Sequence, residues 1–324
     1  MGKGNDRRLP TFVGVGPGRT ATTWLHAALQ GHAGLPRQTK ETDFFSNNYA
    51  LGFNWYLYHF RGYPSSMVLG EITPTYFDCL EASARIARDL VDCKIVCSLR
   101  DPVARIYSHY RLLRSEGWIS RQTFLEALEH HSKWKERSGN LFGASRYAFH
   151  LKRWFSELGR ENVLVTFVED LDQAPQRYLD HITDFIDAPR IALERTGIAN
   201  KHINPCDRAP LHPHLAARAR RLRDAMERKQ LYRTIKFLRP FFRYCFGRGE
   251  LFLPLDTKTE QMLRERFRPE VQALEDLLKR ELSQWKASAS LRQSELGLTT
   301  RTVPKRELLI DFRPGYRTGE KSRG

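Results

Sequence analysis

Apolar runs alternate with amphipathic segments along the first 190 residues of the chain. Short apolar runs of strand length predict four buried strands, over residues 11–16, 66–72, 93–99 and 162–168. Apolar residues at helical spacing predict helices over residues 20–30, from 102 to about 113, and from the fourth strand to about 186. Strands separated by helices are typical of βαβ units. We therefore expect an α/β fold with a central parallel sheet flanked by helices.

The last third of the chain has a different pattern, rich in arginine and without clear strands. Helices are expected over residues 211–229, 231–244 and 260–282, with a loop over 246–254. From Ala287 onward the periodicity fades, and eight Lys/Arg stand against four Asp/Glu. We expect a single domain over residues 1–286, and residues 287–324 form a basic C-terminal extension. Within the domain, residues 1–190 form the α/β core and residues 191–286 its helical part.

The charge of the chain indicates an anionic partner. The 324 residues include 53 Lys and Arg against 37 Asp and Glu, a formal charge of +16, and 41% hydrophobic residues exclude a disordered chain. The partner class stays open: nucleic acid, nucleotide, membrane surface or acidic polymer. Five scattered cysteines without a CxxC pair predict a reduced, cytoplasmic protein without a structural metal. No apolar run predicts a transmembrane segment or a signal peptide.

The first strand ends in a glycine-rich turn that leads into a helix rich in hydroxyl side chains. Free backbone N–H groups at such a helix start attract an anion, and an arginine adds planar donors suited to phosphate or sulfate. The candidate anion-binding residues are Gly18, Arg19, Thr20, Ala21, Thr22 and Thr23. An ordinary turn between strand and helix is the alternative. The arrangement predicts a P-loop-like sheet edge.

Two standard phosphate-binding motifs fit this loop poorly. The Walker A pattern requires glycine where Val13 stands and lysine where Arg19 stands. Arg19 also occupies the third glycine position of the Rossmann fingerprint. A P-loop kinase would further need an aspartate at a strand end to hold Mg²⁺, for which Asp101 is the candidate.

A second candidate anion site follows the third strand. Arg100 lies at the carboxyl end of that strand, where open α/β sheets bind ligands. Ser108 lies eight residues later, two turns into the following helix, so the two side chains can hold one phosphate together. The alternative for Arg100 is an ion pair with Asp101 or another surface carboxylate.

These segments together resemble the sulfotransferases that use 3′-phosphoadenosine 5′-phosphosulfate (PAPS). Residues 19–23 resemble the loop that grips the 5′-phosphosulfate in that family, and residues 100–108 resemble its 3′-phosphate site. Further segments resemble glycan sulfotransferases or, for the last one, bacterial members: residues 40–45, 70–77, 143–154 and 267–285. The resemblance covers about residues 11–285.

The resemblance implies transfer of a sulfuryl group from PAPS to a hydroxyl or amine of a carbohydrate or small molecule, with PAP (3′-phosphoadenosine 5′-phosphate) as product and without a metal. It implies that Glu41 is the general base and that Arg19 stabilises the sulfate and the leaving phosphate. Arg100 and Ser108 would bind the 3′-phosphate. His59 and His109 are alternative bases.

The sequence departs from the family pattern at three positions. Arg19 replaces a lysine, Asp43 replaces a histidine, and Ile72 stands where glycan enzymes often carry a second catalytic lysine. The loop that closes on the cofactor has no clear match; its candidates are Lys201, Arg208 and Arg248.

Some functional alternatives stay open on the sequence. They are a P-loop nucleotide kinase, a basic nucleic-acid-binding protein without catalysis, and a family member that binds PAPS without turnover. The aromatic stretch over residues 44–60 predicts either a platform that stacks on an acceptor or a packed helical core.

Overall fold

A four-stranded parallel sheet forms the centre of the protein, as predicted. The computed structural model describes residues 8–119, 122–129, 141–198, 207–229, 231–246 and 248–287. The strands are β1 (Phe12–Val15), β2 (Gly70–Ile72), β3 (Lys94–Leu99) and β4 (Val163–Phe167), in the order β2-β1-β3-β4. The α-helices are α1 (Thr22–Leu29), α2 (Gly52–Tyr58), α3 (Leu80–Asp89), α4 (Pro102–Ser115), α5 (Phe124–Glu129), α6 (Tyr147–Leu158), α7 (Val168–Gln173), α8 (Pro175–Phe185), α9 (Pro213–Arg228), α10 (Tyr232–Phe237), α11 (Arg239–Cys245), α12 (Thr257–Leu278) and α13 (Ser283–Lys286). Short turns of helix are η1 (Phe44–Asn48), η2 (Tyr49–Leu51), η3 (Pro74–Tyr76), η5 (Gly143–Ser145) and η6 (Leu193–Arg195).

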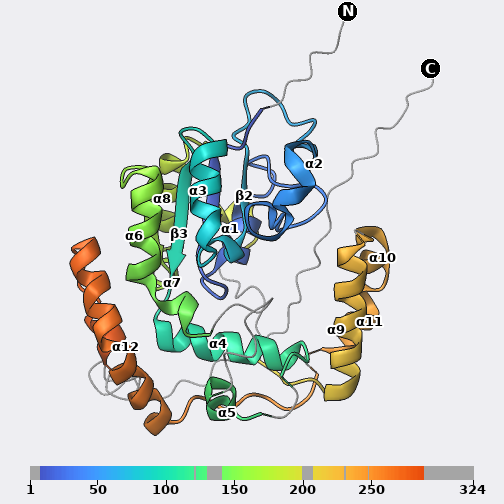
Figure 1. Cartoon of the computed structure of the whole chain (residues 1–324), viewed down its shortest axis with the longest axis vertical. Helices are drawn as coiled ribbons and strands as arrows, with labels where there is room; N and C mark the ends of the chain where they lie inside the picture. Colours follow the sequence, from blue (N-terminus) through green and yellow to red (C-terminus); the bar gives the residue numbers. More distant parts are fainter. Residues whose placement is uncertain are drawn as a thin grey trace, which may run out of the picture.

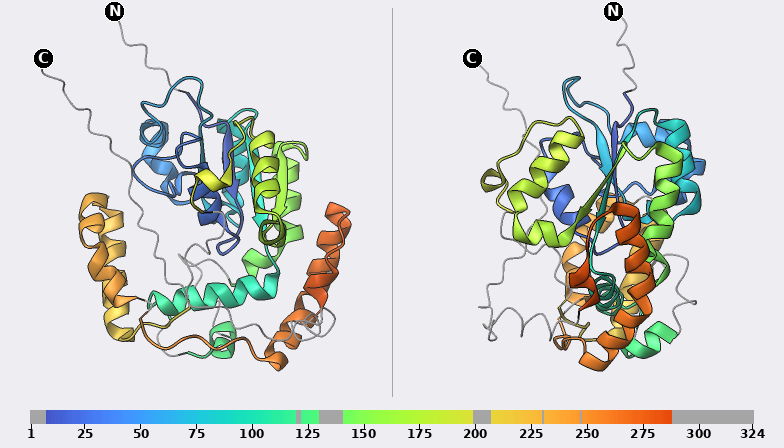
Figure 2. Two further views of the ribbon diagram at one scale, coloured as in Figure 1. Left: turned by 180° about the vertical axis from the view of Figure 1, so that it is seen from behind. Right: turned by 90° about the vertical axis from the view of Figure 1, so that its left-hand side faces the viewer.

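Helices cover both faces of the sheet, so the protein has three layers (Figure 1; Figure 2). Val13 and Ile95 pack in the cluster that includes α3, α6 and α12. Their strand neighbours Phe12 and Val96 point to the other face, in the cluster that includes α1 and α8. The alternation along each strand thus supplies a core to both layers, which a parallel sheet requires.

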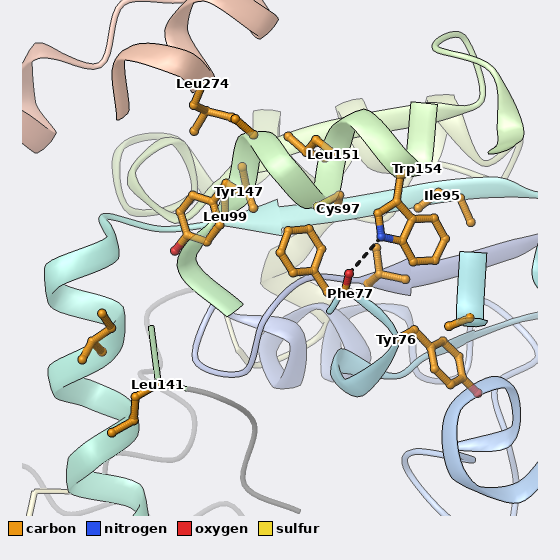
Figure 3. Packing of buried hydrophobic residues seen from close by; sticks show 14 of the residues in the cluster. Tyr76, Phe77, Ile95, Cys97, Leu99, Leu141, Tyr147, Leu151, Trp154 and Leu274 are labelled. Carbon is orange, nitrogen blue, oxygen red and sulfur yellow. Dashed lines mark hydrogen bonds between the residues drawn. The ribbon is translucent and has the colours of Figure 1, made fainter. Parts of the chain in front are cut away.

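The indole of Trp154 fixes α6 to the layer beneath it (Figure 3). Trp154 is fully buried, and its Nε1 donates a hydrogen bond to the carbonyl oxygen of Phe77 at 3.1 Å. Arg153 donates to the same oxygen at 2.8 Å. A buried indole N–H needs such a partner, so this contact ties α6 to the turn that ends at Phe77.

Several predicted elements differ in their ends for clear physical reasons. Helix α1 begins at Thr22, two residues late, because Ala21 has a left-handed backbone with φ of 61°. The helix expected after β4 is divided into α7 and α8 at Ala174, since Pro175 disfavours a helical residue before it. The helix expected over 231–244 is likewise two helices, with Pro240 in the first turn of the second.

Helix α4 extends past the end of the sheet and carries the helical part of the chain. The side chain of Asp101 caps its first turn, accepting a hydrogen bond from the backbone N–H of Val103 at 2.9 Å. Helix α12 contacts α4 and α6, whereas α9, α10 and α11 stand together at the far end of α4 (Figure 1; Figure 2). Of the expected extension over 287–324, all but Ala287 lies outside the described residues.

A buried ion pair joins α12 to the start of α4. Both side chains, Arg264 and Asp101, are almost fully buried, and their N–O distance is 3.2 Å. Arg264 also donates to Glu260 at 2.6 Å and to the carbonyl oxygen of Trp285 at 2.7 Å. Removing one partner of such a pair leaves an uncompensated buried charge.

We therefore expect Arg264→Met to lower the free energy of unfolding by about 3 kcal/mol. The matched control is Arg268→Met, one turn along the same helix, where the arginine is exposed and pairs with Glu265. This exposed pair should contribute less than about 1 kcal/mol. Urea denaturation followed by circular dichroism measures both. Equal losses in the two variants would contradict the role given to the buried pair.

Candidate active site

The loop after β1 is shaped by a close approach to β3. A Cβ at Gly16 would lie 2.4 Å from the carbonyl oxygen of Ser98, and the φ of Gly16 is 134°, so glycine is required there. Arg19 and Ala21 also have positive φ, at 79° and 61°. Non-glycine residues in this region store strain, and successive turns of this kind direct backbone N–H groups into one concavity that suits an anion.

Hydrogen bonds within the loop hold this shape. The hydroxyl of Thr20 donates to the carbonyl oxygen of Pro17 at 2.8 Å, and the hydroxyl of Ser98 donates to the carbonyl oxygen of Thr20 at 2.6 Å. Thr20 is fully buried. Its side chain therefore helps to hold the loop in shape. Thr22 is buried at the start of α1, and the Thr23 hydroxyl accepts from Lys40 at 3.0 Å.

The structure brings together the residues of the two predicted anion sites. The Nε of Arg19 donates to the hydroxyl of Ser108 on α4 at 2.9 Å. The Nη1 of Arg100 lies 3.4 Å from the carbonyl oxygen of Arg19. Burial lowers the pKa of Arg100, and the positive charge of Arg19 lowers it further. An anion bound between two like charges that act on each other stabilises both.

The contacts of Asp101 differ from those expected for a surface ion pair with Arg100 or for a Mg²⁺ ligand of a kinase. Its carboxylate caps α4 and pairs with Arg264 across the buried interface with α12. Asp101 is therefore engaged in buried contacts, in place of the surface ion pair with Arg100 that was the alternative for Arg100. These contacts also engage the oxygens that a nucleotide kinase would use for Mg²⁺. Within the described part of the chain, no three His, Cys, Asp or Glu residues gather as metal ligands do.

Arg105 is a site residue that the sequence pattern did not single out. It is fully buried on α4, with Nε donating to the Ser145 hydroxyl at 2.7 Å and Nη1 lying 3.4 Å from the carbonyl oxygen of Gly18. Tyr147 donates to the carbonyl oxygen of Arg100 at 2.8 Å. The available signal was an arginine on the apolar face of the expected helix, beside Ile106, where a charge must have a structural reason.

Glu41 lies beside the phosphate-loop candidate residues, although it comes from a different segment. The Nζ of Lys40 contacts Oε1 of Glu41 at 2.6 Å and the hydroxyl of Thr23 at 3.0 Å. The Glu41 side chain is 33% exposed, so an acceptor in solution can reach it. Lys40 thus links the candidate base to the start of α1.

A second carboxylate, Glu71 on β2, fixes the segment that carries Glu41. Glu71 is fully buried, and burial raises its pKa. It accepts hydrogen bonds from the hydroxyls of Thr42 at 2.5 Å, Thr73 at 2.8 Å and Tyr56 at 2.8 Å, and Tyr76 completes the set at 3.1 Å. The bond from Thr42, the neighbour of Glu41, ties the loop to the sheet.

The structure shows what surrounds the positions that depart from the family pattern and the candidates for the loop that closes on the cofactor. Ile72 is fully buried, and a Cβ at Gly14 would meet it at 2.8 Å, so this position belongs to the core. Asp43 accepts from the Thr75 hydroxyl at 2.5 Å. Arg208 donates to the carbonyl oxygen of Gly249 at 3.2 Å, and Arg248 is exposed. Lys201 lies outside the described residues.

The other candidate residues are part of the core. His59 is buried against Trp55, and burial lowers its pKa to about 4. His109 is buried on α4, with its Nδ1 3.5 Å from Arg105. Most of the aromatic stretch packs in the large cluster: Phe44, Phe45, Tyr49, Phe53, Trp55, Tyr56 and Phe60. Of the two alternatives for this stretch, the structure therefore favours core packing for those rings.

Comparison with known proteins identifies the family. A family model described as "Sulfotransferase domain" matches residues 10–214. The chain is 35% identical over 117 residues to the membrane-associated sulfotransferase kil1 of Dictyostelium discoideum, which covers 35% of this chain and 24% of that protein. It is 27% identical over 247 residues to human heparan sulfate glucosamine 3-O-sulfotransferase 3B1, covering 72% of this chain and 62% of the relative. The chain thus spans between about a quarter and three fifths of the length of these relatives.

A solved structure shares the fold. The sulfotransferase from Alicyclobacillus acidocaldarius superposes with a TM-score of 0.62, at 19% sequence identity, over 86% of this chain and all of that one. The match extends beyond the segment that the family model covers. The helical part after residue 214 is therefore included in a shared architecture.

The close approach at Gly16 can be tested by stability. We expect Gly16→Ala to lower the free energy of unfolding by about 3 kcal/mol, because the added methyl group meets the Ser98 carbonyl and the backbone is strained. Gly18→Ala is the matched control: a Cβ there meets nothing within 4 Å. It should change stability by less than about 0.5 kcal/mol. Chemical denaturation measures both, and similar losses would contradict this account of the loop.

Proposed function

This chain belongs to the sulfotransferase domain family, and we propose that it transfers a sulfuryl group from PAPS to a hydroxyl or amine of a carbohydrate acceptor. The observation that carries the proposal is the convergence of Arg19, Arg100 and Ser108 at the carboxyl edge of β1 and β3. Ligands bind at this edge of open α/β sheets. PAPS carries phosphate groups at both its 3′ and 5′ positions. It can therefore bind both Arg19, which follows β1, and Arg100, which follows β3.

The donor set fits PAPS in its chemistry. The N–H groups of the loop from Gly18 to Thr23, together with Arg19, would hold the 5′-phosphosulfate. Arg100 and Ser108 would hold the 3′-phosphate, with Tyr147 fixing the backbone of Arg100 through its carbonyl oxygen. Arg105 would keep the loop in place from beneath through the Gly18 carbonyl. Planar guanidinium groups bind such oxygens in bidentate fashion.

Glu41 would act as the general base in this reaction. PAPS supplies an activated sulfuryl group, whose bond to the 5′-phosphate breaks as the acceptor atom attacks sulfur. Glu41 takes the proton that the acceptor loses, while Lys40 holds the carboxylate beside Thr23. Arg19 keeps its charge throughout and stabilises the leaving phosphate without donating a proton. Positioning and charge stabilisation thus supply most of the catalysis.

The acceptor class is proposed from the relatives and from charge. Heparan sulfate appears in the name of the human relative, which acts on a glucosamine unit by that name. The formal charge of +16 on this chain suits an acidic polysaccharide. Scattered cysteines without a CxxC pair support a cytoplasmic location as part of the proposal. The contacts of Asp101 with Arg264 argue against the nucleotide kinase alternative.

Calorimetric titration with PAP tests the cofactor site. We expect micromolar binding to the wild type and a dissociation constant that rises about tenfold to a hundredfold in Arg100→Ala, because a charge-assisted contact to the 3′-phosphate is lost. The matched control, Arg177→Ala, removes an exposed arginine on α8 and should bind as the wild type does. Binding of ATP–Mg²⁺ in place of PAP would overturn the proposal in favour of a kinase.

The role of Glu41 is tested separately from binding. We expect Glu41→Gln to reduce kcat for sulfuryl transfer from labelled PAPS to heparan-type polysaccharides by about 10²- to 10⁴-fold, since the general base is removed. The affinity for PAP should stay unchanged, and Glu157→Gln, at an exposed carboxylate on α6, should keep full activity. PAP binding without wild-type turnover above the Glu41→Gln background would instead identify a binding protein that lacks catalysis.

A further inference from the structure

The three helices at the far end of α4 form a small unit, here called the arm, over residues 213–246. Phe242 and Cys245 of α11 are buried with Ala219 of α9, and this cluster is separate from the two cores of the sheet. The arm is fixed to the end of α4 by an ion pair between Arg223 and Glu116 at 2.9 Å. Figure 1 shows the arm standing away from the sheet, and Figure 2 agrees from behind.

The outer face of the arm exposes large apolar side chains at helical spacing. Phe237 is 82% exposed, Tyr244 is 52% exposed and Phe241 is 41% exposed. Leu231, directly before α10, is 43% exposed. The residues that follow or precede them by one position face inward instead and pack in the arm's core: Leu238, Phe242 and Cys245. The arm therefore has one apolar face that packs in its own core and another that is exposed to solvent.

The sequence of this segment is also strongly basic. Residues 231–246 contain four basic residues and no acidic one; the basic residues are Arg233, Lys236, Arg239 and Arg243. A sequence that mixes aromatic residues with arginine and lysine is typical of segments that lie in the headgroup region of a bilayer. Among the described helices, none is long and apolar enough to cross a bilayer.

We propose that the arm docks on the surface of an anionic phospholipid bilayer, with Phe237, Phe241 and Tyr244 entering the interface. The positive charge of residues 231–246 favours a bilayer over a second copy of the chain as the partner of this face. A symmetric contact would bring two such basic segments together, and the like charges would repel. Anionic headgroups instead attract each basic residue while the aromatic rings bury apolar surface.

Docking by the arm is independent of the proposed sulfuryl transfer. Arg100 precedes the first turn of α4, whereas the arm contacts Glu116 after its last turn. The 14 residues of α4 separate the two points by about 21 Å. A variant of the arm should therefore leave PAP binding unchanged, and a failure of either proposal leaves the other standing.

Vesicle sedimentation with the full-length chain tests the proposal. We expect the protein to bind vesicles of equimolar phosphatidylcholine and phosphatidylglycerol, and to bind pure phosphatidylcholine vesicles at least about tenfold more weakly. The double variants Phe237→Ser with Phe241→Ser, and Arg233→Ser with Arg243→Ser, should each weaken binding to the mixed vesicles by about tenfold or more. Circular dichroism and thermal unfolding of each variant show whether the fold is kept, independently of PAP binding.

Matched controls come from exposed residues elsewhere on the chain. Leu80→Ser with Val91→Ser removes two apolar side chains that are 62% and 75% exposed around α3. Lys152→Ser with Arg177→Ser removes two exposed charges. Both controls should bind vesicles as the wild type does. The proposal is overturned if the wild type ignores the mixed vesicles or if controls and arm variants lose binding equally. A dimer in light scattering that the phenylalanine variant converts to a monomer, without vesicle binding, would overturn it in favour of a second copy.

Discussion

The carboxyl end of β3 is the point on which the rest of the structure depends. Asp101, directly after it, caps α4 and pairs with Arg264 of α12, and its backbone N–H donates to Glu169 at 2.9 Å. Glu169 in turn accepts from the indole of Trp285 at 3.0 Å. One corner thereby joins the sheet, α4 and the last two helices. Arg100 immediately precedes this corner, so the position of its guanidinium depends on packing by residues far away in sequence.

The same arrangement places several positive charges close to the loop after β1. Arg19, Arg100 and Arg105 converge around one loop, and burial together with neighbouring cations lowers the pKa of Arg100 and Arg105. Arg105 offsets its burial with neutral oxygens, from Ser145 and the carbonyl of Gly18. These oxygens satisfy its donors without neutralising its charge, whereas the nearby carboxyl of Asp78 acts to raise the pKa of Arg105. The site is therefore electrostatically complementary to a ligand with several negative charges, and this complementarity arises from the fold itself.

The sequence predicted the strands well, because they depend on local pattern, and local pattern also singled out the two segments that are proposed to bind anions. Gly16 and Arg19 sit in one loop, and Arg100 ends a strand of clear periodicity. That parallel strands place both segments at one edge follows from topology alone. The pairing of Asp101 with Arg264 was not predictable, since 163 positions separate the two residues. Nor was the inward use of the Thr20 hydroxyl, which depends on a left-handed loop that no local propensity indicates.

Two carboxylates connected through Thr42, those of Glu41 and Glu71, illustrate why the structure was needed to describe the site. Glu41 and Glu71 both belong to segments that resemble glycan sulfotransferases, and the resemblance gives a role as general base to Glu41 alone. The structure separates their environments: four hydroxyls surround Glu71 in a dry interior, whereas Glu41 is a third exposed and lies beside Lys40. A carboxylate whose oxygens accept several internal hydrogen bonds cannot reach an acceptor, but it can fix a loop. The bond from Thr42 to Glu71 does this, so the buried carboxylate helps to position the exposed one, which is the proposed general base.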